Sequence, residues 1–97
     1  MDNVTDKNPA DDQGWTPYHT AAKNGKIRIV QDILANVTNK NPADKKAHTP
    51  LHCAAKAGHI QIVKAILNHV TDKTPIDEEG LTPKALFLRH VSDMNWE

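Results

Sequence analysis

Apolar residues in the segment 60–67 recur at the spacing of one helical face. They are Ile60, Ile62, Val63, Ile66 and Leu67. Because the pattern does not alternate strictly between apolar and polar residues, it predicts a helix rather than a strand. The following segment, 70–79, is mostly polar and contains Pro75. This composition predicts an extended, hairpin-like loop.

A shorter helix is expected immediately before this one. Thr49 can cap its free N–H groups, and Pro50 is tolerated at the first helical position. Gly58 is expected to end the helix, because glycine readily adopts a left-handed conformation. Small and apolar residues fill the segment between these signals, namely Leu51, Cys53, Ala54 and Ala55. The pattern therefore predicts two consecutive helices followed by a loop.

The whole pattern recurs with a period of 33 residues, marked by Thr-Pro at 16–17, 49–50 and 82–83. The segments 14–46 and 47–79 align without a gap and are identical at about half of their positions. One helix pair cannot bury its apolar face alone, whereas stacked pairs can. We therefore expect an all-α solenoid of stacked helix-turn-helix units joined by hairpin-like loops. Its shared interior should bury Ile29, Val30, Ile62 and Val63.

The period, together with Thr-Pro-Leu-His-Cys-Ala-Ala at 49–55 and Gly58-His59, resembles the ankyrin repeat. This resemblance implies an ankyrin-repeat solenoid and one domain over 1–97. The domain is divided into a partial leading hairpin 1–13, a repeat 14–46, a repeat 47–79 and a degenerate, truncated repeat 80–97. The resemblance also implies that His19 and His52 are structural, each hydrogen-bonding the threonine at the start of its helix.

Departures from the family pattern concentrate in the loops and in the third unit. Ala47 replaces a hairpin glycine that is kept as Gly14 and Gly80, and valine stands at positions 37 and 70 where the family usually has glycine. Lys84 and Arg89 are expected to make the outer face of the third unit more hydrophilic, as a terminal repeat requires. We expect either a part of a longer array or a small diverged protein stabilised by a partner.

Charge and composition exclude several classes of function. Lys+Arg and Asp+Glu are equal at 12 each, so the net charge is zero. A nucleic-acid binder usually has a basic excess, and so does a protein that docks on anionic membranes. We therefore expect neither nucleic acid nor membrane as a partner. A single cysteine and the lack of a signal-like or membrane-spanning apolar run favour an intracellular, most simply cytoplasmic, protein.

Residues that could carry chemistry have structural explanations. His48, His52 and Cys53 are close in sequence, but structural zinc requires four converging ligands, so we expect no metal and no cofactor. Cys53 is expected to be a small, buried packing residue. The loop acids, including Asp44 and Asp77, are expected to form turns and to be solvated. No catalytic motif is present, and we expect no enzyme.

Positions that vary between units at exposed sites are the candidates for binding, because the recurring positions hold the stack together. The resemblance implies that a partner protein binds the concave face formed by loop tips and first helices. The alternative is a structural spacer in a larger ankyrin protein, without a ligand of its own. The candidate residues are Asp12, Gln13, Trp15, Lys23, Asn24, Lys45, Lys46, His48, Lys56, Ala57, Glu78, Glu79 and Leu81.

Two further expectations concern single residues. Trp15 is either an exposed binding anchor, because aromatic residues dominate interface hot spots, or a residue that packs locally on Tyr18 or His48. Some ankyrin hairpins are hydroxylated at asparagine, and the resemblance places Asn8 and Asn41 at the matching loop position.

Overall fold

The computed structural model describes residues 9–90. Five helices lie in this range, and it contains no strand. In chain order they are α1 (Pro17–Lys23), α2 (Ile27–Asn36), α3 (Pro50–Ala57), α4 (Ile60–Leu67) and α5 (Pro83–His90). The predicted all-α solenoid of stacked helix pairs is confirmed. Nothing is described for 1–8 and 91–97, so Asn8 and the end of the third unit lie outside the described residues.

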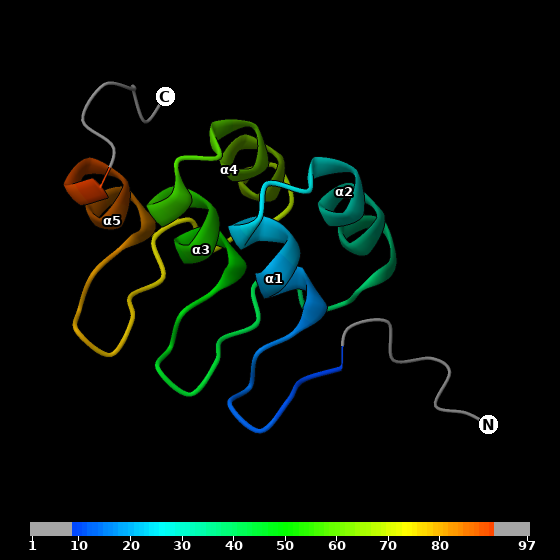
Figure 1. Ribbon diagram of the computed structural model, residues 1–97, viewed down its shortest axis with the longest axis horizontal. Coiled ribbons are helices and arrows are strands. Elements are labelled where there is room, and N and C mark those ends of the chain that lie inside the picture. Colours follow the sequence, from blue (N-terminus) through cyan, green and yellow to red (C-terminus); the bar gives the residue numbers. More distant parts are fainter. Residues whose placement is uncertain (1–8, 91–97) are drawn as a thin grey trace.

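The helices form two layers (Figure 1). The inner layer consists of α1, α3 and α5, and the outer layer consists of α2 and α4. Neighbours within a layer pack together, α1 with α3, α3 with α5, and α2 with α4. Hairpin-like loops extend from the first layer, all in one direction (Figure 1). Among the helices of residues 9–90, none is long and apolar enough to cross a membrane.

The first helix of each complete unit begins as the sequence predicted. Thr49 Oγ1 accepts a hydrogen bond from the His52 backbone N–H at 3.3 Å, and His52 Nδ1 accepts one from the Thr49 N–H at 3.1 Å. The Thr16–His19 pair repeats this arrangement at the start of α1. Gly58 ends α3 with a left-handed φ of 78°. The two histidines are therefore structural, as the resemblance implied.

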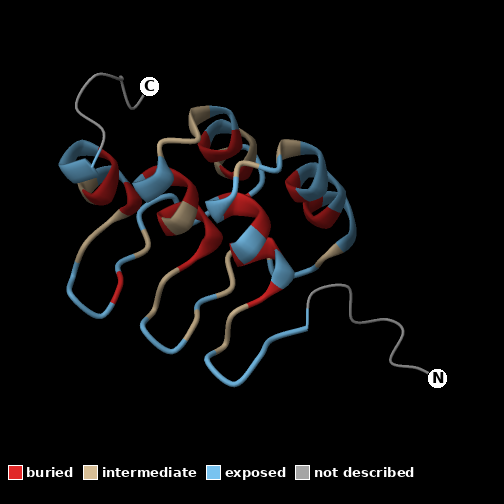
Figure 2. Cartoon of the chain, in the orientation of Figure 1, coloured by how far each residue is buried: buried red, intermediate tan, exposed pale blue. Residues whose placement is uncertain are grey.

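The core lies between the two layers (Figure 2). Val30, Ile62 and Val63 are buried as expected, but Ile29 is 50% exposed. The expectation for Ile29 is wrong, although Ile62, which is 2% exposed, holds the equivalent position one unit later. The difference arises because α2 packs on α4, whereas no described helix packs on the other side of α2. Burial at this position depends on a preceding helix pair.

The three hairpins have the same turn geometry and are joined to one another. In each of them, an aspartate side chain accepts the backbone N–H groups two and four residues later, as Asp44 does for Lys46 and His48. The Lys45 N–H donates to the Gln13 carbonyl at 2.8 Å, and the Glu78 N–H donates to the Lys46 carbonyl at 3.0 Å. These bonds tie the hairpin tips into one continuous edge.

Ala47 stands in the second hairpin where the first and third hairpins have glycine. Ala47 has a φ of 62°, in the left-handed region that Gly14 and Gly80 also occupy, so alanine keeps the turn at the cost of strain.

Asp77 forms its turn as predicted, but it is only 4% exposed, so its expected solvation is wrong. Burial is possible because the backbone N–H groups of its own turn and the neighbouring His48 surround the carboxylate.

The third unit is built around Phe87 and Leu86, which are buried. Lys84 and Arg89 are exposed on α5, as expected for the more hydrophilic face of an end unit. The third unit thus supplies an inner-layer helix that packs against α3.

Candidate functional site

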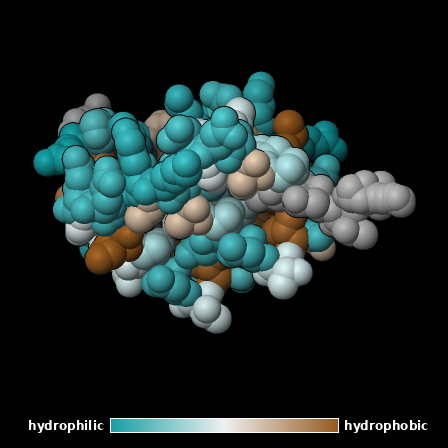
Figure 3. Space-filling model, turned by 90° about the horizontal axis from the view of Figure 1, so that it is seen from below, coloured by the Kyte–Doolittle hydropathy of each residue, from teal (hydrophilic) through white to brown (hydrophobic). Residues whose placement is uncertain are grey.

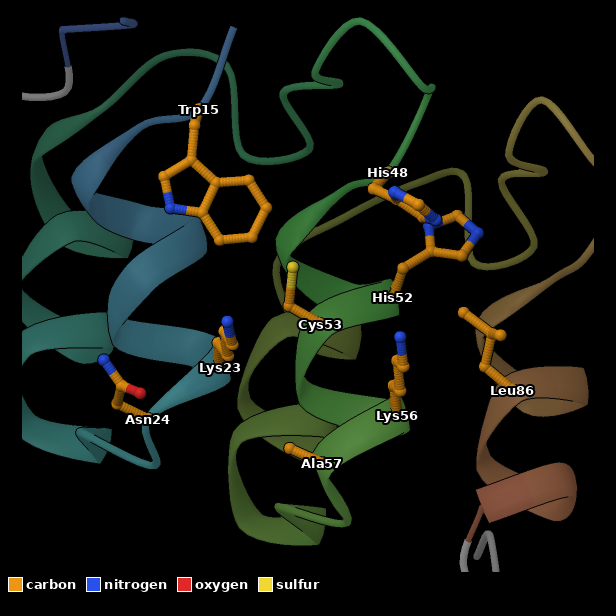
Figure 4. Close-up of a pocket in the computed structure, with 9 residues that line it drawn as sticks. All are labelled: Trp15, Lys23, Asn24, His48, His52, Cys53, Lys56, Ala57 and Leu86. Carbon is orange, nitrogen blue, oxygen red and sulfur yellow. The ribbon is translucent and has the colours of Figure 1, made fainter. Parts of the chain in front are cut away.

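A groove of about 420 Å³ runs across the inner layer, between the helices and the bases of the hairpins (Figure 4). All three inner helices contribute to it. The lining residues are Trp15, Lys23, Asn24, His48, His52, Cys53, Lys56, Ala57 and Leu86. A second hollow of about 300 Å³ adjoins it at the hairpins and shares Trp15 and His48 with it. Its other lining residues are Gln13, Asp44, Lys45 and Lys46.

The structure brings together most of the candidate residues found by sequence variation. Nine of the predicted positions line one of the two hollows, and they are Gln13, Trp15, Lys23, Asn24, Lys45, Lys46, His48, Lys56 and Ala57. Asp12, Glu78, Glu79 and Leu81 line neither of these two hollows. Their role in binding stays a prediction.

Sequence reasoning missed three lining residues, His52, Cys53 and Leu86. The sequence contains a signal that could have identified two of them, Cys53 and Leu86. Cys53 and Leu86 occupy the same position of successive repeats and differ in type, as does Thr20 one unit earlier. The sequence predicts Cys53 to be a small, buried packing residue, whereas the side chains of Cys53 and Leu86 face the concave side of the inner layer (Figure 4).

Trp15 is half-buried at the hairpin end of the groove (Figure 4). Its indole Nε1 donates to Thr20 Oγ1 at 2.6 Å, and its ring stacks on His19 with the ring centroids 4.8 Å apart. The indole is therefore held by Thr20 and His19 of its own unit, and not by Tyr18 or His48, which were the expected packing partners. The remaining part of the indole lines both hollows.

His19 and His52 are neutral supports beneath the groove. Nε2 of His19 donates to the His48 carbonyl oxygen at 2.9 Å, while its Nδ1 accepts from the Thr16 N–H. Burial lowers the pKa of both imidazoles below the usual 6.5, and the hydrogen bonds to the next unit only partly offset this effect. Each ring thus connects a helix start to the following hairpin without carrying charge at neutral pH.

His48 links the second and third hairpins. Its Nε2 lies 3.2 Å from Asp77 Oδ2, and its Nδ1 lies 3.9 Å from Asp44 Oδ2. Asp77 Oδ2 is buried and has no hydrogen-bond partner among the described residues, so the His48 imidazole is its polar neighbour. Burial raises the pKa of Asp77, but the N–H groups of Leu81 and Glu79 outweigh it, and the pKa falls below its usual 3.8.

Cys53 is half-buried rather than fully buried, which corrects the expectation from sequence. Burial, aided by the charge of Asp44, raises the pKa of its thiol to about 12. A thiol of this pKa is protonated at neutral pH and is a poor nucleophile. Over residues 9–90, no three His, Cys, Asp or Glu side chains come together in a way that could hold a metal ion.

A family model described as ankyrin repeats, in three copies, matches residues 1–83. No match was found among curated protein sequences.

Proposed function

Since the chain belongs to the ankyrin-repeat family, whose repeats generally act as protein–protein interaction modules, we propose that its concave groove binds a segment of a partner protein. The observation that carries this proposal is the gathering of candidate side chains from different units around one groove. Trp15, Lys23, His48 and Lys56 come from two units and face the same hollow (Figure 4).

Hydrogen bonds between units hold the walls of the groove together. His19 ties the first unit to the second, and His52 ties the second to the third, through hydrogen bonds of 2.9 Å to backbone carbonyls. The hairpin tips are joined by further backbone hydrogen bonds. A preorganised surface loses little conformational entropy on binding, which favours affinity.

The size and character of the groove suit a peptide segment. A volume of about 420 Å³ accommodates a few side chains, and residues of mixed polarity line it. Seen from the hairpin side, the surface is mainly hydrophilic, with small separate apolar patches (Figure 3). An interface of this kind resembles the mixed surfaces of non-obligate complexes rather than the apolar faces of permanent ones.

The test compares binding by groove variants and by outer-layer variants. The groove variant is Trp15→Ala/Lys46→Ala, and its matched control is Gln31→Ala/Lys64→Ala, on exposed positions of α2 and α4. Proteins captured from cell extract by each variant are quantified by mass spectrometry, and thermal melting monitors folding.

We expect a captured protein that is lost with the groove variant and retained with the control, while both variants still melt cooperatively. Equal retention by the two variants would place binding elsewhere and refute the groove. If the chain captures nothing beyond what an unrelated ankyrin array of equal length captures, the spacer role is favoured instead.

A further inference from the structure

Basic side chains recur at one position of each inner helix. Lys23, Lys56 and Arg89 are separated by one repeat each, and each lies exposed in the last turn of its helix. Among the described residues, no carboxylate lies within 4.0 Å of any of them. We call these three residues the basic row.

Two members of the basic row line the groove, and Arg89 holds the equivalent position on α5. Lys23 and Lys56 are lining residues, and Figure 4 shows both side chains on the open side of the helices. No aspartate or glutamate lines this groove. Lys45 and Lys46 add positive charge at the adjoining hollow, where the Asp44 Oδ1 atom already accepts two hydrogen bonds of its own turn.

Three acidic residues of the hairpins do not line the groove, whereas Asp44 and Asp77 lie beside His48 with their Oδ1 atoms accepting the N–H groups of their own turns. Asp12 is at the first tip, and Glu78 and Glu79 are at the third, while the second tip carries the lysines. The chain as a whole has zero net charge. The positive charges of Lys23 and Lys56 therefore stand at the groove itself, and acidic tips flank it. This pattern selects a short acidic segment over a long polyanion, which would also meet the acidic tips.

Helix packing fixes the spacing of the basic row. Packed helices lie about 8–10 Å apart, and an extended chain in the polyproline II conformation advances about 3.1 Å per residue and completes one turn in three residues. Three residues of an extended segment therefore span the distance between neighbouring inner helices, which α1, α3 and α5 are.

We propose that the groove binds an extended acidic segment of a partner protein, with carboxylates three residues apart facing Lys23, Lys56 and Arg89 and an apolar side chain against Trp15. This inference rests on the proposed function and specifies the chemistry of the partner. In the polyproline II conformation every third side chain points in the same direction, so all three carboxylates would face the basic row.

The test uses synthetic peptides of equal length and measures their binding by fluorescence anisotropy. One peptide carries three aspartates at every third position and one leucine, and the second carries the same residues with the aspartates at every second position. A third peptide has asparagine in place of aspartate. We expect the first to bind at least tenfold more tightly than the other two, and less tightly as salt increases.

The protein variants are matched in charge. Lys23→Gln/Lys56→Gln removes two charges from the basic row, and Lys26→Gln/Lys64→Gln removes two exposed charges outside the groove lining. We expect the first pair to weaken binding at least tenfold and the second pair to leave it unchanged. A role of Lys23 and Lys56 only at the negative ends of their helices would lower the melting temperature without this selective loss of binding.

Four results would overturn the inference. Equal binding of the two aspartate spacings, or equal loss with the two variant pairs, would indicate unspecific attraction. Equally strong competition by a single-stranded oligonucleotide of the same charge would indicate a polyanion site. If no acidic peptide binds while the groove variant still loses its captured protein, the partner chemistry is wrong but the proposed function stands.

Discussion

The imidazole of His52 donates through Nε2 to the carbonyl oxygen of Leu81 at 2.9 Å, and through this bond the start of α3 holds the base of the next hairpin. The opposite ring nitrogen, Nδ1, accepts the Thr49 N–H of the helix cap. Both bonds are satisfied by the neutral tautomer that carries its proton on Nε2. Protonation of Nδ1 would remove the acceptor and break the cap.

Stability should therefore fall in mild acid. The pKa values of His19 and His52 lie below the usual 6.5 in the folded chain, so the unfolded chain takes up protons first as the pH falls. Their contribution is complete above pH 6.5 and is lost as the pH falls below it, by up to about 1.4 kcal/mol per pH unit for each histidine. Asp77 acts in the same direction, but only below its usual 3.8.

Urea unfolding at pH 7.5, 6.5 and 5.5 measures this loss, and NMR titration of the His52 ring locates its pKa directly. We expect a smaller free energy of unfolding at pH 5.5 than at pH 7.5. Equal free energies at these two values would show that the histidines are not neutral supports.

The strained turn at Ala47 offers a stabilising change. Alanine at a φ of 62° is disfavoured relative to glycine, so Ala47→Gly should raise the free energy of unfolding by about 1 kcal/mol. Gly14→Ala should do the opposite, because a Cβ there would lie 3.0 Å from the Asp44 Cα, in addition to the strain of a left-handed alanine. Ala57→Gly, at the exposed end of α3, is a control for the general effect of glycine. A loss of stability with Ala47→Gly would contradict the strained turn.

The equivalent residues Ile29 and Ile62 form a matched pair for the core. Ile62→Asp places a charge at a position that is 2% exposed and should abolish cooperative unfolding. Ile29→Asp places the same charge at a position that is 50% exposed and should change stability by less than about 1 kcal/mol. Circular dichroism melts distinguish the two variants. Similar melting of both would mean that the neighbouring helix pair does not determine burial.

The His48–Asp77 pair should contribute to stability across two hairpins. His48→Ala leaves the buried Asp77 Oδ2 without its imidazole neighbour and should cost about 1–3 kcal/mol in chemical unfolding. In a double-mutant cycle, Asp77→Asn should show a smaller additional cost in the His48→Ala background than alone. Strict additivity of the two changes would indicate that the 3.2 Å contact carries no coupling.

The binding candidates could be found in part because the repeat itself separates structural from variable positions. Comparing equivalent positions was enough to select Trp15 and His48, which differ between units. Lys23 and Lys56 recur as lysine and were selected as exposed positions of the first helices, and the structure then places all four around one groove. The same comparison did not select Cys53 and Leu86, because an apolar residue on an inner helix has the same sequence signature whether it faces the core or the groove. It also did not find Thr20 as the partner of Trp15, because that contact depends on side-chain direction.

Local signals in the sequence determined where each helix starts and stops and that the units stack. The threonine–proline starts, the glycine ends and the apolar stripes act within a few residues, and the period repeats them. Only the tertiary structure decided which identical residues are buried, as Ile29 and Ile62 show, and that Asp77 lies beneath His48. The physical reason is that burial and the pairing of charges depend on neighbours supplied by another unit, and the sequence of one unit does not specify these neighbours.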